Sequence, residues 1–136
     1  MPLQLKARKI KDFKERPETL GEHLKKRRLK AGLTQDEVAR VLRISDASYH
    51  NWENDYREPM VRFMPRLIKW LGYDPFPEPT TAGEEIISKR RRAGISRKRL
   101  AKEMGIDEST LEKIEKSQIV LKPYVVRLIS RLLTMR

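Results

Sequence analysis

The side chains of this chain that could do chemistry are mostly charged. Lysines and arginines number 31 against 19 aspartates and glutamates, a formal charge of +12 on 136 residues. Cysteine is absent, which excludes disulfides, thiolate metal sites and cysteine nucleophiles. The two histidines, His23 and His50, are 27 residues apart and cannot build a zinc site alone. With no acid–base–nucleophile cluster and no glycine-rich phosphate loop, we expect neither an enzyme nor a cofactor or metal site, and the charge favours a polyanionic partner.

The positive charge is spread along the whole chain. Residues 1–18 carry a net charge of +3, residues 19–76 carry +3 and residues 77–136 carry +6. A basic tail on a neutral body is therefore excluded, although positive charge can also serve solubility alone. A length of 136 residues suits one ordinary domain or two very small ones. No apolar run is long enough for a membrane span or a signal peptide, so we expect a cytoplasmic protein.

The sequence repeats itself with a shift of 62 residues. This shift superposes identical residues, namely Gly21-Glu22 on Gly83-Glu84, Arg28 on Arg90, Ala31-Gly32 on Ala93-Gly94, Ala39 on Ala101, Ile44 on Ile106 and Glu53 on Glu115. After one deletion the shift becomes 61, which matches Met64, Leu67, Ile68 and Leu71 with Val125, Leu128, Ile129 and Leu132, and Trp70 with Arg131. The last two sets have the i, i+3, i+4, i+7 spacing of a helix. We therefore predict two copies of one small helical unit.

Capping residues mark where the helices begin. Capping boxes are predicted at three Thr–Glu pairs, Thr19–Glu22, Thr34–Glu37 and Thr81–Glu84. Simple caps are predicted at Ser45, Ser96 and Asp107. The first copy thus contains helices at about 20–30, 35–42 and 46–54 and a fourth beyond them. Two short helices joined by a very short turn form a helix-turn-helix.

Proline marks the predicted boundary between the copies. Residues 73–80 contain three prolines and are predicted to be a semi-extended linker. The predicted organisation is a basic arm at 1–18, a helix-turn-helix domain at 19–72, the linker at 73–80 and a second, more divergent helix-turn-helix domain at 81–136.

The motif in the first copy resembles the phage-repressor and Cro-like helix-turn-helix family, also called the xenobiotic-response-element (XRE) family. The residues that carry the resemblance are LTQDEVARVLRIS at 33–45 and YHNWEN at 49–54, and residues 95–116 of the second copy look like a weaker member. The resemblance implies an all-α protein with two small lambda-repressor-like bundles in tandem, DNA binding and control of transcription.

The resemblance also implies which residues meet DNA. Gln35 stands at the position where the family holds a phosphate and supports a base contact. Asn54 is at the position where a side chain holds phosphate at the end of the recognition helix. Arg62 is at the position from which some members reach the minor groove. Base edges are faced by the positions of Asp46, Ala47 and Asn51. For His50, a contact to base or phosphate and plain exposure stay open. The matching positions of the second copy are Arg97, Glu108, Ser109, Lys113 and Lys116.

Other matched positions are predicted to be structural. The resemblance implies internal ion pairs Arg28–Glu53 and Arg90–Glu115, and Tyr49 and Trp52 fall on the inward stripe. The family usually has glycine in the turn and after the recognition helix. This chain has Arg43 in the first turn and Gly105 in the second, and Asp55 and Ser117 after the recognition helices.

The predicted function is that of a sequence-specific DNA-binding regulator of transcription, a nucleoid-associated protein with double-stranded DNA as its partner and no membrane association. The second copy has Asp107, Glu108 and Glu112 on the side that is expected to face DNA. Carboxylates weaken DNA binding in a groove lined by phosphates unless they accept hydrogen bonds from cytosine amino groups. The second copy is a candidate for self-association or for a protein partner. The alternative for the whole chain is a protein-interaction module, such as an antitoxin or a coactivator-type adaptor.

Overall fold

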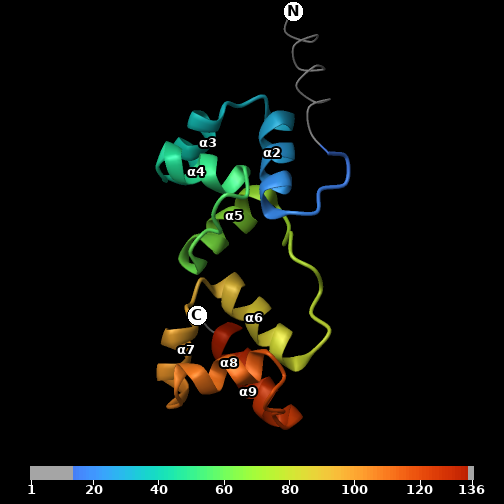
Figure 1. Cartoon of the computed structure of the whole chain (residues 1–136), viewed down its shortest axis with the longest axis vertical. Coiled ribbons are helices and arrows are strands. Elements are labelled where there is room, and N and C mark those ends of the chain that lie inside the picture. Colours follow the sequence, from blue (N-terminus) through green and yellow to red (C-terminus); the bar gives the residue numbers. More distant parts are fainter. Residues whose placement is uncertain (1–13, 135–136) are drawn as a thin grey trace, which may run out of the picture. The chain divides into compact units, whose positions relative to one another are not determined.

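The computed structural model describes residues 14–134, and all regular secondary structure in that range is helical (Figure 1). The first copy contains α2 (Leu20–Ala31), α3 (Gln35–Leu42), α4 (Asp46–Glu53), the 3-10 helix η1 (Val61–Phe63) and α5 (Met64–Leu71). The second contains α6 (Ala82–Ala93), α7 (Arg97–Met104), α8 (Glu108–Glu115) and α9 (Pro123–Thr134). The predicted all-α class is confirmed for the described residues. None of the helices in this range is long and apolar enough to cross a membrane.

Contacts divide the chain into two compact units. The first comprises the residues up to Pro59 together with Arg66–Phe76, and the second comprises Met60–Pro65 and the residues from Pro77 onward. The largest fully buried side chains of the first unit are Leu24, Val38, Tyr49 and Leu67. The core of the second consists of Ile86, Ile95, Leu100, Ala101, Leu111, Ile114, Ile129 and Leu133. Of the predicted basic arm, residues 1–13 lie outside the described part of the chain.

The helix caps are only partly as predicted. Thr34 and Glu37 form both bonds of a capping box, with N–O distances of 3.2 and 3.0 Å. Thr19 and Thr81 cap their helices through the hydroxyl, but their glutamates act elsewhere, because Glu22 pairs with Lys14 and Glu84 accepts from Thr80. Asp107 stands at its N-cap position without a side-chain cap bond, so that prediction is wrong in its chemistry.

Burial corrects the predicted alignment of the last helices. In the first copy Met64, Leu67 and Leu71 are buried, and in the second Val126, Ile129 and Leu133 are buried. The shift between these sets is 62 residues, so no deletion is needed and the shift of 61 is wrong. Leu128 and Leu132, which the shift of 61 placed in the core, are 53% and 51% exposed. Trp70 accordingly corresponds to Leu132 and not to Arg131.

Three residues adopt the left-handed conformation where glycine is usual. Arg43 has φ 59°, Asp55 has φ 57° and Ser117 has φ 61°, whereas Gly105 has φ 72° at the second turn. A side chain in this region costs on the order of 1 kcal/mol relative to glycine. Arg43 still closes α3 correctly, because its N–H donates to the carbonyls of the last turn. The short turn between α3 and α4 therefore forms without glycine.

Candidate nucleic-acid interface

Helix α4 separates its side chains into a buried face and an exposed face. Tyr49, Trp52 and Glu53 are buried, and Tyr49 and Trp52 are core residues as predicted. The exposed face carries candidate contact residues, namely Asp46, Ala47, His50 and Asn54, with Asn51 half-buried beside them. The helix begins at Ser45, whose hydroxyl accepts from Ser48 N at 3.1 Å. The cap and the buried stripe together hold the polar face of α4 outward.

Three of the predicted contact residues are joined by hydrogen bonds. Nδ1 of His50 lies 3.1 Å from Oε1 of Gln35, which begins α3, and 3.3 Å from Nδ2 of Asn54. Nδ2 of Asn54 also donates to the His50 carbonyl at 2.8 Å. Oε1 of Gln35 only accepts and Nδ2 of Asn54 only donates, so Nδ1 of His50 cannot form a hydrogen bond with both. The shorter distance to Oε1, together with the bond from Nδ2 to the His50 carbonyl, favours the tautomer with the proton on Nδ1, and Asn54 is then joined to His50 through that carbonyl. In neutral His50 the Nε2 atom is then an acceptor.

The chain after α4 adds an aromatic side chain that the sequence analysis did not single out. Tyr56 is 70% exposed, and its ring centroid lies 6.0 Å from that of His50 in an edge-on arrangement. The left-handed Asp55 turns the backbone so that the N–H groups of Tyr56 and Arg57 donate to the Asn51 carbonyl. Tyr56 lies outside the helical period, so periodicity gave no signal. Its closeness in sequence to Asn54 was the available clue.

The predicted ion pairs are present in the structure. Nη2 of Arg28 lies 2.6 Å from Oε1 of Glu53, and Nε of Arg90 lies 2.9 Å from Oε2 of Glu115. Both glutamates are buried, so α4 and α8 each direct one carboxylate inward. For Tyr49 next to this pair, burial and then the charge of Glu53 raise the pKa of the hydroxyl. These ionic contacts anchor α4 to α2 and α8 to α6.

In the second copy, Arg97 points into this internal network. Its Nε atom lies 2.7 Å from Oε1 of Glu115, so that Glu115 accepts from both Arg90 and Arg97. The hydrogen bond to Glu115 raises the pKa of Arg97 despite partial burial. Arg97 occupies the position of Gln35, but its Nε atom is engaged with the protein. A contact of Arg97 with DNA stays a prediction.

The outward face of α8 carries both signs of charge. Glu108, Ser109 and Lys113 are exposed on it. Nζ of Lys116 lies 2.8 Å from Oε1 of Glu112, and this hydrogen bond lowers the pKa of Glu112. The lysine that matches Asn54 is therefore paired with a carboxylate four residues earlier.

Arg62 belongs to Met60–Pro65, the segment that is grouped with the second unit. It is an exposed residue of η1, and its guanidinium lies 4.7 Å from the ring centroid of Phe63. Its predicted approach to the minor groove stays a prediction.

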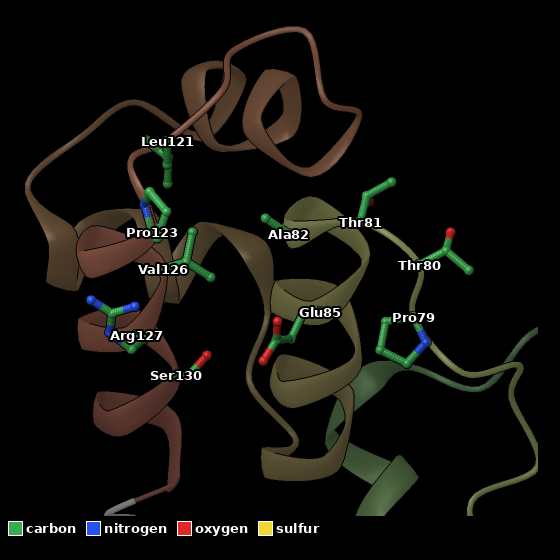
Figure 2. Close-up of a pocket in the computed structure, with 10 residues that line it drawn as sticks. All are labelled: Pro79, Thr80, Thr81, Ala82, Glu85, Leu121, Pro123, Val126, Arg127 and Ser130. Carbon is green, nitrogen blue, oxygen red and sulfur yellow. The ribbon is translucent and has the colours of Figure 1, made fainter.

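The second unit also has an open groove of about 510 Å³ between α6 and α9 (Figure 2). Glu85 of α6 and Arg127 of α9 stand on its walls, and the rest of the lining is mainly proline, threonine and apolar side chains. Within residues 14–134 no three histidine, aspartate or glutamate side chains gather as metal ligands. The groove thus supplies shape and two opposite charges, but no recognisable catalytic set.

Two relatives from Bacillus subtilis (strain 168) match parts of the chain. Over 41 residues, 30% of this chain and 32% of the relative, it is 49% identical to the HTH-type transcriptional regulator ImmR. Over 51 residues, 38% of this chain and 67% of the relative, it is 43% identical to the uncharacterized HTH-type transcriptional regulator YqaF. The matched part therefore spans about a third of ImmR and two thirds of YqaF. No solved structure matches the chain.

The family comparison covers both copies. The sequence model of the helix-turn-helix family matches residues 24–76, from α2 to beyond α5, and again residues 86–134, from α6 to the end of α9. The matches include both pairs of short helices whose geometry is described above. The chain therefore belongs to the helix-turn-helix family, of the XRE type, and carries two copies of its fold in tandem.

Proposed function

We propose that this chain is a sequence-specific regulator of transcription that reads the major groove of double-stranded DNA with α4 of the first copy. The observation that carries the proposal is the hydrogen-bonded set Gln35, His50 and Asn54 on the exposed side of α3 and α4. An α-helix fits the major groove, and polar side chains held in place by their neighbours can read base edges there.

The residue types on α4 suit base reading. Asn51 can make a bidentate contact with adenine, and Asp46 can accept from the amino group of cytosine. Ala47 offers a methyl group to thymine. With Nδ1 of His50 bonded to Gln35, Nε2 accepts from the amino group of adenine or cytosine when the ring is neutral. The first copy would thus contact the major-groove edges of adenine, cytosine and thymine.

Phosphate contacts would come from elsewhere on the chain. The N-terminus of α3 carries the N–H groups of Gln35 and Asp36, which its capping box does not engage, and is a place for a phosphate beside Gln35. The net positive charge lies entirely outside α4 and α8, each of which has a net charge of −2 including its buried glutamate. This division fits a protein in which flanking cations provide affinity and a few polar residues provide specificity.

Selection of binding sequences from a random DNA pool tests the proposal directly. At physiological salt the full chain should enrich a motif, and the same selection with Asn51→Ala should give a motif degenerate at one position. The affinity for the enriched site should fall steeply with salt. Recovery of no motif by the full chain would rule out a sequence-specific reader.

The second candidate function is that of a protein-interaction module with weak, non-specific DNA binding, such as an antitoxin or a coactivator-type adaptor. It is favoured by the second copy, where Arg97 is bound to Glu115, Lys116 is bound to Glu112, and Asp107 and Glu108 are exposed. A stoichiometric protein partner that co-purifies, together with sequence-blind DNA binding, would support this candidate over the first. The second copy could also mediate self-association, which sedimentation of the free chain would detect.

A further inference from the structure

The outer face of α9 is unusually apolar for an exposed helix. Tyr124, Leu128 and Leu132 are 55%, 53% and 51% exposed, and their i, i+4, i+8 spacing places them along one line, which we call the α9 stripe. The opposite face packs on α6 and buries Val126, Ile129 and Leu133. Scattered exposed apolar residues are ordinary, but a continuous line of three large side chains marks an interaction surface.

The same positions of the first copy are not apolar in this way. With the shift of 62 that burial establishes, Tyr124 corresponds to Arg62 and Leu128 to Arg66. Leu132 corresponds to Trp70, which is half-buried and has the guanidinium of Arg27 at 4.2 Å from its ring centroid. The fold therefore accepts polar or covered residues at these positions. The α9 stripe is a property of the second copy and not a requirement of the fold.

The charged residues of α9 itself have one sign. Arg127 and Arg131 directly precede Leu128 and Leu132 and are exposed, so they form a line parallel to the stripe. From residue 116 to the end of the chain there is no aspartate or glutamate, while five lysines and arginines are present. The lining of the groove that contains Arg127 also contains the carboxylate of Glu85, on α6 (Figure 2). A ligand of this face needs apolar groups beside negative charge.

We propose that the outer face of α9 is a docking surface for an acidic amphipathic helix of a partner protein. Its leucines would cover the α9 stripe, and its carboxylates would pair with Arg127 and Arg131. Another molecule of this chain fits less well, because an antiparallel α9–α9 pair sets the arginine line of one helix against that of the other. DNA would satisfy the arginines but would leave Leu128 and Leu132 against a charged backbone. The proposal is independent of whether the first copy reads DNA.

The test uses the full chain and a displayed library of amphipathic helices that have fixed leucines and Glu, Lys or Gln at the polar positions. We expect enrichment of Glu over Lys beside the leucines. Leu128→Arg, which installs the residue type of Arg66, should weaken the selected peptides by about tenfold or more. The double variant Arg127→Glu/Arg131→Glu should reverse the preference from Glu to Lys.

Controls separate the proposal from loss of structure. Val41→Arg changes a side chain of similar exposure, 57%, on α3 and should leave peptide binding unchanged. Circular dichroism should show that Leu128→Arg is folded, and Leu128→Gln replaces it if it is not. Failure to enrich acidic peptides, or enrichment indifferent to these variants, would refute the proposal. The proposal would also be refuted if the chain formed a dimer that Leu128→Arg dissociates. It would equally be refuted if Arg127→Glu/Arg131→Glu lost DNA affinity and kept its preference for Glu over Lys in the peptides.

Discussion

The hydroxyl of Thr19 donates a 2.6 Å hydrogen bond to Oδ2 of Asp55, which ties the start of α2 to the residue after the C-cap of α4. The other carboxylate oxygen, Oδ1, accepts from Gly21 N at 3.0 Å. A carboxylate at a helix N-terminus is favourable because it meets free N–H groups and the positive end of the helix dipole. Asp55 thus has a reason to stand where glycine is usual, although its own φ is 57°.

Substitutions at Asp55 should separate the capping bonds from the backbone strain. Asp55→Ala loses both bonds and keeps the unfavourable φ, so we expect it to lower the free energy of unfolding by about 1–3 kcal/mol. Asp55→Gly loses the bonds but relieves the strain, so its loss should be smaller by about 1 kcal/mol. Urea unfolding followed by tryptophan fluorescence measures this, because both tryptophans, Trp52 and Trp70, are in the first unit. Equal losses in the two variants would show that φ contributes no strain.

The two internal ion pairs differ in a way that predicts unequal losses. Arg28→Ala strands the buried carboxylate of Glu53, which should cost about 3–5 kcal/mol. Arg90→Ala leaves Glu115 with Arg97 at 2.7 Å, so the second unit should lose less. The comparison is matched, because Arg28 and Arg90 each also donate to a backbone carbonyl five residues ahead. The double variant Arg90→Ala/Arg97→Ala should restore the full loss, and circular dichroism, which reports both units, measures it.

The paired helices were predictable because local signals and packing agree on them. The caps at Thr34 and Ser45 and the buried stripe of Val38, Tyr49 and Trp52 place α3 and α4 where the structure has them. The ends of the copies were harder. Leu128 and Leu132 match a helical period as well as Ile129 and Leu133 do, so periodicity alone could not decide which line faces the core.

The candidate site was predictable in its residues but not in their contacts. The resemblance points to Gln35, His50 and Asn54 one position at a time. Only the fold shows that they lie within hydrogen-bond distance of one another. The length of a side chain explains the opposite outcome for Arg97. Arginine at that position reaches the buried Glu115. In the first copy the shorter Gln35 leaves the corresponding carboxylate, Glu53, to Arg28. Sequence spacing could not reveal that competition.

The partial burial of His23 should make the first unit less stable in mild acid. Nδ1 of His23 lies 2.6 Å from the Tyr73 hydroxyl, and burial followed by the charge of Lys26 lowers the pKa of His23. The unfolded chain therefore binds a proton more readily than the folded chain. The stability from neutral His23 is complete above its unfolded pKa of about 6.5 and is lost as pH falls toward the lower folded value.

Urea unfolding between about pH 5.5 and 7.5 checks this sign, because most carboxylates stay ionised over that range. The unfolding midpoint of the unchanged chain should fall toward the acid end, and that of His23→Gln should vary less. His50→Gln provides the control. It leaves His23 in place and should keep the pH dependence of the midpoint. A midpoint that rises on acidification would mean that the folded state favours the charged imidazole.

Substitutions on α4 should change sequence preference in a way that substitutions on α2 do not. Asn51→Ala should remove discrimination of roughly 1–3 kcal/mol at one base pair, because a bidentate contact carries about that much. Lys25→Ala on α2 is the control and should change affinity evenly across sequences or not at all.

Gln35→Leu on α3 removes the acceptor at 3.1 Å from His50 Nδ1, so the ring can take either tautomer. Discrimination at the base pair that His50 reads should then weaken while the Asn51 position keeps its preference. If Asn51→Ala and Gln35→Leu both select the same motif as the unchanged chain, α4 does not read DNA in this register.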